Sequence, residues 1–244
     1  MKLYSEFDVV ADLHCHTLAS SHAYSTITEL AKAASERGLV AIGCTDHGVA
    51  MPGAPHSWHF GNLKDLPDKI EGVRVFQGVE ANVVDFDGRL DMDNGILKRL
   101  ELVIASMHGG LMPKGSVEQC TNAWLSVVNN PHVDILGHSG EPAFAYDYET
   151  VLKAVKQNGK AVELNEHSFV ARPQSIDNCI SIAKLCKDLG VFVAVNSDSH
   201  YHDAVGKFER WKQILNDIDF PCNLIINSNK EILTLFFKNR GINF

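Results

Sequence analysis

Short, almost wholly apolar runs alternate along this chain with segments of helical periodicity. The apolar runs are rich in Val, Ile and Leu, as is typical of strands buried on both faces, and cover residues 8–14, 39–47, 73–84, 100–108, 133–140, 160–168 and 191–200. The helical segments cover residues 26–38, 116–129, 147–158, 175–189 and roughly 203–217. Strands that alternate with helices indicate a mainly parallel sheet, and at least seven such units without a linker predict a barrel.

Two local signals add detail to this pattern. Gly38 follows the first helical segment and predicts its end. Residues 83–92 have the pattern of an inserted β-hairpin that turns at Asp87 and Gly88.

Length and composition fit one domain that spans residues 1–244. Apolar residues make up 45% of the chain, and no apolar run reaches the about 20 residues of a membrane span. Glu6 and Asp8 interrupt the N-terminal segment, which lacks the apolar core of a signal peptide, so we expect a cytoplasmic protein. The six cysteines have no CxxC spacing and fit reduced, buried thiols.

The formal net charge is −8, and the chain has no run of Lys or Arg. A nonspecific nucleic-acid surface needs a basic stripe, so nucleic acid is disfavoured as a partner. A small anionic substrate is still compatible with this charge, because bound metal ions can reverse the local field.

Twelve histidines are distributed unevenly, and several stand where predicted strands end. His14 and His16 end the first strand, where a two-residue period puts them on one face with Asp12 and puts Cys15 on the other. The later strands end in the same residue types, namely His47, Glu80, His108, His138 and the pair Asp198 and His200. Because the functional face of a barrel lies at the carboxyl ends of its strands, we expect these side chains to converge.

A single histidine at a strand end is more often a rim or core residue than a metal ligand. Recurrence at nearly every strand end favours metal, because burying so many titratable groups without partners costs several kcal/mol each. Metal ions remove that cost, since neutral imidazoles and carboxylates become ligands. The sequence therefore predicts a metal centre at the rim of the barrel.

The motifs DLHCHT, TDH, GVEAN, MHGG, GHSG and SDSH occur in this order on successive predicted strands. In these motifs the chain resembles the PHP superfamily, named for polymerase and histidinol phosphatase, over nearly its whole length. The segments APHSWHF (54–60) and FERWKQIL (208–215) are similar to the YcdX-type phosphatases within it. The resemblance implies a distorted (βα)7 TIM-like barrel, the PHP fold, with three divalent metal ions.

The resemblance also implies which residues bind each ion. By motif position, the first ion would be bound by His14, His16 and Asp198, and the second by His108 and His138. The third would be bound by His22, His47 and His200. Glu80 would bridge the first ion to the second. A histidine-rich ligand set without thiolate fits zinc, with manganese or iron as alternatives, better than calcium or magnesium.

This centre predicts hydrolysis of a small-molecule phosphate monoester by attack of a metal-bound hydroxide. Three divalent ions would shift the formal charge of the chain from −8 to −2 and create an electropositive pocket for phosphate oxygens. The residues predicted to act in catalysis are Glu80, Asp198, His200 and His59.

Four residues are predicted to contact the substrate. His56 and His59 lie on a predicted loop with Trp58, where they would bind phosphate or donate a proton to the leaving group; the alternative is a surface loop packed by its aromatic residues. Arg172 and Lys114, on loops after strand ends, are candidate phosphate anchors.

Asp12 and Asp46 stand beside histidines of the ligand set in the sequence. They are candidates to orient imidazole rings through hydrogen bonds, although an aspartate at a strand end can equally act as a cap.

Three other functions compete with the phosphatase prediction. A phosphodiesterase or exonuclease would need a basic groove, which the composition does not offer. A metal-dependent amide or lactone hydrolase usually carries a carboxylated lysine or a catalytic aspartate, and no lysine stands at a predicted strand end. A non-enzymatic metal-holding protein would gain nothing from a substrate-sized loop. The resemblance further implies assembly as a homotrimer.

Overall fold

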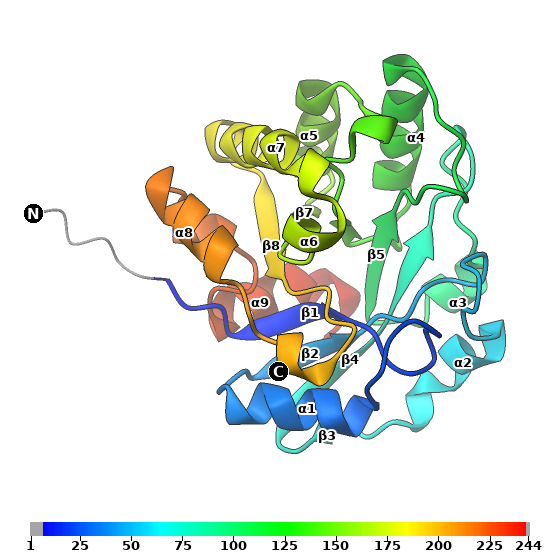
Figure 1. Ribbon diagram of the computed structural model, residues 1–244, viewed down its shortest axis with the longest axis vertical. Coiled ribbons are helices and arrows are strands. Elements are labelled where there is room, and N and C mark those ends of the chain that lie inside the picture. Colours follow the sequence, from blue (N-terminus) through cyan, green and yellow to red (C-terminus); the bar gives the residue numbers. More distant parts are fainter. Residues whose placement is uncertain (1–6, 243–244) are drawn as a thin grey trace, which may run out of the picture.

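A computed structural model describes residues 7–242 and shows a nearly closed barrel of seven parallel strands (Figure 1). Around the barrel the strands are β1 (Ala11–Cys15), β2 (Ala41–Cys44), β4 (Val73–Asn82), β5 (Leu102–Ser106), β6 (Ile135–Leu136), β7 (Ala161–Asn165) and β8 (Phe192–Asn196). The short strand β3 (Lys69–Ile70) pairs antiparallel with β4. The predicted barrel is confirmed, and each apolar run coincides with one of its strands, although β1 extends one residue beyond its run.

Helices lie between and after the strands along the chain, and most of them cover the outside of the barrel (Figure 1). They are α1 (Ile27–Glu36), α2 (Ser57–Asn62), α3 (Asn94–Leu97), α4 (Val117–Asn129), α5 (Tyr148–Gln157), α6 (Ser168–Ala171), α7 (Ile176–Leu189), α8 (Glu209–Asp217) and α9 (Lys230–Phe237). Capping boxes begin two of them, with Thr26 before α1 and Ser116 before α4, which explains why both starts were readable from the sequence.

Three local predictions change in the structure. The helix predicted from about residue 203 begins at Glu209, because residues 202–204 form a separate 3-10 turn. The loop predicted around His56 and His59 contains helix α2. The sequence did not indicate this helix, because its N-cap is His56 and not one of the usual capping residues Ser, Thr, Asp or Asn. The predicted hairpin is present but short: Val83 and Leu90 form an antiparallel bridge, and the Val84 N–H donates to the Arg89 carbonyl at 2.9 Å.

Two apolar clusters fill the structure. The larger packs the helices against the outside of the sheet and contains Trp124 and Trp211. The smaller combines alternate residues of the strands, such as Leu102 and Ile104, with Leu233 and Phe237 of α9. Helix α9 therefore packs against the barrel's inner apolar cluster, where the Phe237 ring lies 4.9 Å from the Phe76 ring.

The first and last strands, β1 and β8, approach each other at the seam of the barrel without pairing directly as strands. Residues 225–227 are inserted between them, and the Val10 N–H donates to the Asn227 carbonyl at 2.8 Å. The buried Asn227 side chain accepts from the Val195 N–H (3.1 Å) and donates to the carbonyls of Ala11 (2.8 Å) and Val195 (2.6 Å). One amide thus replaces strand pairing along this part of the seam.

Replacing Asn227 with alanine is expected to lower the free energy of unfolding by about 3 kcal/mol, because buried backbone groups on both strands lose their partners. Chemical denaturation measures this change. The exposed Asn158→Ala is the control, with an expected change below about 0.5 kcal/mol. Equal stability of the two variants would contradict the role of Asn227 at the seam.

Strand β1 departs from regular pairing where its metal-ligand candidates begin. Its register with β2 shifts between Asp12 and Cys15. The carboxylate of Asp12 accepts from the backbone N–H groups of Ser197 (3.0 Å) and Gly206 (2.9 Å), on the β8 side of the seam, whereas His14 contacts carboxylates inside the barrel. The prediction that Asp12 shares the face of the two histidines is wrong, because this irregularity breaks the two-residue period.

All six cysteines are free, and five of them are buried. None of the helices within residues 7–242 combines the length and the apolar character that crossing a membrane requires.

Candidate metal centre

The structure brings together the side chains of all nine predicted ligands at the carboxyl ends of the strands. They are His14 in β1 and His16 directly after it, His22 on the following loop, His47 after β2, Glu80 in β4, His108 after β5, His138 after β6, and Asp198 and His200 after β8. Most of the nine are buried, and His14 and His16 have no exposed surface.

The first predicted group surrounds a small volume next to the seam. The Nε2 atoms of His14 and His16 lie 3.1 Å apart, and Asp198 Oδ1 lies 3.5 Å and 3.1 Å from them, respectively. Three buried ligand atoms at such distances are suited to converge on one cation, because an imidazole Nε2 and a carboxylate oxygen are common ligands of divalent metals.

Glu80 stands between this group and the second one. Its Oε2 lies 3.5 Å from His14 Nε2, and its Oε1 lies 2.9 Å from His138 Nε2 and 3.4 Å from His108 Nε2. The two oxygens therefore face different sets of imidazoles, which is the arrangement a bridging carboxylate needs.

One observation tests directly whether these residues fit a cation. Glu80 Oε2 and His47 Nδ1 are buried and 2.6 Å apart, yet neither makes a hydrogen bond. Buried polar atoms are nearly always satisfied, so orphaned atoms at this position fit ligands of an ion that is shared between them.

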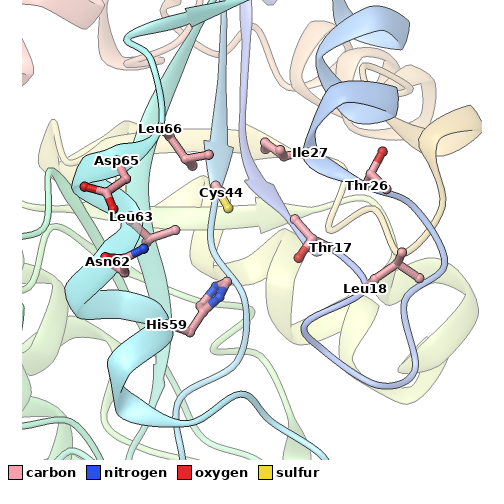
Figure 2. A pocket seen from close by; sticks show the side chains of 10 residues that line it. All are labelled: Thr17, Leu18, Thr26, Ile27, Cys44, His59, Asn62, Leu63, Asp65 and Leu66. Atoms are coloured by element: carbon pink, nitrogen blue, oxygen red, sulfur yellow. The ribbon is translucent and has the colours of Figure 1, made fainter.

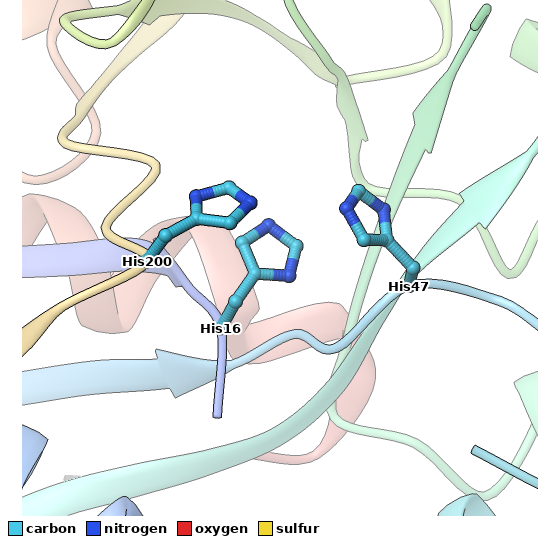
Figure 3. A group of neighbouring side chains, drawn as sticks. All are labelled: His16, His47 and His200. Carbon is cyan, nitrogen blue, oxygen red and sulfur yellow. The ribbon is translucent and has the colours of Figure 1, made fainter. Parts of the chain in front are cut away.

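The third predicted group lies nearer the surface. The Nε2 atoms of His22 and His47 are 3.1 Å apart, and the ring of His22 stacks on that of His200 with centroids 4.9 Å apart. The ligand atoms of His16, His47 and His200 also lie within 4.8 Å of one another (Figure 3). His47 and His16 thus border more than one group, and the division of the nine residues among three ions stays a prediction.

The charges of this cluster suit metal binding. Burial alone would raise the pKa of Glu80, but His47, His108 and His14 hold it well below its usual range, so the carboxylate is ionised. Burial lowers the pKa of His16 to about 3 and that of His138 to about 4, so both rings are neutral near pH 7. Neutral imidazoles and ionised carboxylates are the forms that bind metal.

Two ligands in the centre have unusual backbone conformations. His138 has a φ of 23° and Asp198 a φ of 55°, in the left-handed region that residues other than glycine rarely adopt. A strained backbone conformation persists only where contacts with the surrounding structure hold it in place, and such positions are often functional.

Partners that sequence reasoning missed fix two of the imidazoles. Glu163 Oε1 lies 2.7 Å from His14 Nδ1, and Asn82 Oδ1 lies 2.8 Å from His108 Nδ1. When Nδ1 of the neutral ring donates its hydrogen bond to such an oxygen, the lone pair lies on Nε2 and is directed into the centre. A signal for Glu163 was present, because it is a lone carboxylate in the apolar strand AVELN and needed a buried partner.

Asp46 holds the loop after β1 in place. Its carboxylate accepts from the Thr17 N–H and hydroxyl (2.8 and 2.7 Å) and from the Ser20 hydroxyl (2.7 Å), while Ser20 Oγ accepts from the His47 N–H (3.1 Å). Ser20 Oγ also lies 3.5 Å from His16 Nδ1. Asp46 therefore positions two histidines through Ser20 and does not bind their rings directly.

His59 lies behind this loop. Its Nε2 is 3.3 Å from Asp46 Oδ2, and its ring borders a cavity of about 330 Å³ between α1 and α2 (Figure 2). The residues that line the cavity, among them Leu18 and Cys44, include none of the nine predicted ligands. The roles predicted for His59 in catalysis and substrate binding stay predictions.

The other predicted substrate contacts differ in position. Arg172 donates from Nη2 to Asp198 Oδ2 (2.9 Å) and so contacts a predicted ligand. His56 is exposed and accepts from the Trp58 N–H as the cap of α2, and Lys114 is exposed. Arg172 is thus the one of these three that the structure places at the centre.

His167 also borders the centre, although the sequence assigned it no role. Its ring stacks on that of His200 with centroids 5.4 Å apart. It extends the cluster of imidazoles toward the loop after β7.

Comparison with known proteins shows the family of the chain. Residues 12–167 match the model of the PHP domain, and the chain belongs to the PHP domain family. It is similar to a "Probable phosphatase" of Acetivibrio thermocellus, with 46% identity over 231 residues, covering 95% of this chain and 96% of that protein. A probable phosphatase of Clostridium novyi is also 46% identical, over 233 residues and with the same coverage of both chains.

A solved structure shares the fold. The histidinol phosphate phosphatase of Lactococcus lactis, solved with zinc, L-histidinol and phosphate, superposes with a TM-score of 0.60. It is 17% identical and covers 87% of this chain and 95% of its own. This likeness confirms the distorted barrel of the PHP fold.

Proposed function

We propose that this protein is a metal-dependent phosphatase that hydrolyses a small-molecule phosphate monoester at a centre of three divalent ions. The observation that carries the proposal is Glu80, whose two oxygens face separate groups of buried imidazoles. The names of relatives at 46% identity support phosphatase activity. The amide or lactone hydrolase and the phosphodiesterase have no comparable support.

The donor set favours zinc as the resident metal, with manganese or iron as alternatives. Seven of the nine predicted ligands are histidines, and the other two are the carboxylates Glu80 and Asp198. Cys15, the thiol nearest in sequence to His14 and His16, packs in the outer apolar cluster. Imidazole and carboxylate without thiolate suit these three metals.

The residues of the chain would prepare the substrate in distinct ways. When bound, the ions would lower the pKa of a coordinated water and withdraw charge from the phosphoryl oxygens. Arg172, part-buried beside Asp198, would hold the ligand carboxylate and present its remaining donors to a phosphate oxygen. His56, His59 and Lys114 stay predictions as further contacts, as does assembly into a homotrimer.

Release of inorganic phosphate tests the proposal. The protein, loaded separately with zinc and manganese, is expected to hydrolyse at least one ester in a panel of sugar phosphates, histidinol phosphate, nucleotides and pyridoxal phosphate. A phosphodiester and a lactone extend the panel to the competing reactions. Turnover of either one, with none of the monoesters hydrolysed, would replace the proposed activity.

A further inference from the structure

Glu163 lies in the middle of β7, inside the barrel, with a side chain that has no exposed surface. It is not one of the nine predicted ligands. All four of its hydrogen-bond partners are donors: His14 Nδ1 (2.7 Å) and Asn196 Nδ2 (2.9 Å) at Oε1, and the His138 N–H (2.9 Å) and Asn165 Nδ2 (3.0 Å) at Oε2. The position therefore requires a group that only accepts hydrogen bonds, which an ionised carboxylate is.

The two oxygens of this carboxylate act on different predicted ion sites. At Oε1, the bond to Nδ1 of His14 sets the ring so that Nε2 faces His16 and Asp198. At Oε2, the bond to the backbone of His138 supports the strained conformation, with a φ of 23°, that directs its Nε2 to Glu80.

A third connection runs from Glu163 through Asn165. The Asn165 amide donates to Glu163 Oε2 and to Asp198 Oδ2, both at 3.0 Å. The first ion site is thus tied to Glu163 through two of its ligands, His14 and Asp198. The described contacts of Glu163 reach none of His22, His47 or His200, which form the third predicted group.

We propose that Glu163 is a positioning residue that couples the first two ion sites, so that they assemble together and independently of the third. The inference rests on the metal centre of the proposed function. It goes beyond that function because it makes Glu163, which is not a predicted ligand, responsible for the joint binding of two ions. Partners of this kind, one step from the metal, typically contribute 10- to 100-fold to metal affinity.

Glu163→Gln is the sharpest variant, since it keeps the shape of the side chain. Its amide nitrogen must face one pair of donors, whichever way it is turned. Zinc affinity is measured by competition with a chromophoric chelator, and zinc content by elemental analysis. We expect the affinities of two ions to fall together, by about 10- to 100-fold, and that of the third to stay within about twofold.

Two further variants complete the design. Glu163→Asp keeps an acceptor-only group and is expected to recover part of the lost affinity, which a purely steric role would not do. Glu163→Gln combined with His22→Ala, which removes a ligand of the third group, is expected to lose tight binding of all three ions.

Glu166→Gln is the matched control, in the loop directly after β7. Glu166 is also buried, but its carboxylate accepts from the N–H groups of Arg210 (3.3 Å) and Trp211 (3.1 Å) at the start of α8. The same substitution there is expected to lower the melting temperature and leave all three zinc affinities unchanged.

Three outcomes would overturn the inference, and they are distinguishable. Unchanged zinc affinities in Glu163→Gln remove the positioning role, and a loss confined to one ion removes the coupling. In both cases the proposed phosphatase stands. A wild-type protein that binds no divalent ion overturns the metal centre, and the proposed function with it.

Discussion

Replacing Glu80 with glutamine is expected to lower kcat/KM for phosphate release by at least about a thousandfold and to reduce the bound metal in the same preparation. Glutamine keeps one carbonyl oxygen, so it can face His138 or His14 but cannot offer a negatively charged oxygen to both groups. The neutral amide also leaves the cations with one compensating carboxylate, Asp198, in place of two. Elemental analysis and a phosphate-release assay measure the two effects.

Glu118→Gln is the control for this variant, because Glu118 is exposed in the first turn of α4. It is expected to keep wild-type metal content and turnover. Full activity of Glu80→Gln on any phosphate ester would remove the bridging role. Loss of activity with unchanged metal content would instead assign Glu80 a role in the reaction without a role in loading.

Removing metal with a chelator is expected to abolish phosphate release and to lower the melting temperature by about 10 °C. The estimate follows from ligand linkage: an ion present at about a thousand times its Kd stabilises the fold by about 4 kcal/mol, and a chain of this size loses roughly 2–4 °C per kcal/mol. Adding zinc or manganese is expected to restore both properties. Calorimetry of the loaded and chelated protein makes the measurement.

The loss of stability on chelation should grow with pH. Burial alone would lower the pKa of His14, but Glu163, Asp198 and Glu80 raise it well above 6.5, so His14 is protonated in the metal-free protein. The interaction of protonated His14 with these carboxylates stabilises the metal-free fold. This stabilisation is complete below about pH 6.5 and is lost as the pH rises through the raised pKa of His14. Metal binding requires the neutral ring and strengthens over the same range. A difference in melting temperature that shrinks between pH 6.5 and 9 would contradict this linkage.

The sequence was sufficient for the barrel because its strands are apolar on both faces and its main helices carry clear caps, such as Thr26 and Ser116. The convergence of the eight predicted ligands at strand ends was also readable, since parallel strands bring their carboxyl ends to one rim. His22, on the loop after β1, was assigned by the family resemblance alone. No long-range information was needed for either inference.

The sequence was insufficient where a neighbouring strand decides the outcome. The face of Asp12 depends on the irregular pairing of β1 with β2, and periodicity assumes regular pairing. No pattern in the sequence singled out Asn227, because only the gap between β1 and β8 gives its amide a structural role. Glu163 was visible as a misplaced charge, but its four partners come from β1, β7, β8 and the segment after β6.

The seam between β1 and β8 has a consequence for how the chain folds. His14 and Asp198 are separated by most of the sequence. Because contacts between residues so far apart in sequence form slowly, we expect the first ion site to form late in folding. During synthesis, β1 emerges long before β8, so His14 and His16 leave the ribosome before Asp198 has been synthesised. Zinc supplied to a nascent chain that stops before β8 should therefore be retained weakly, and the completed strand should convert it into a tightly bound ion.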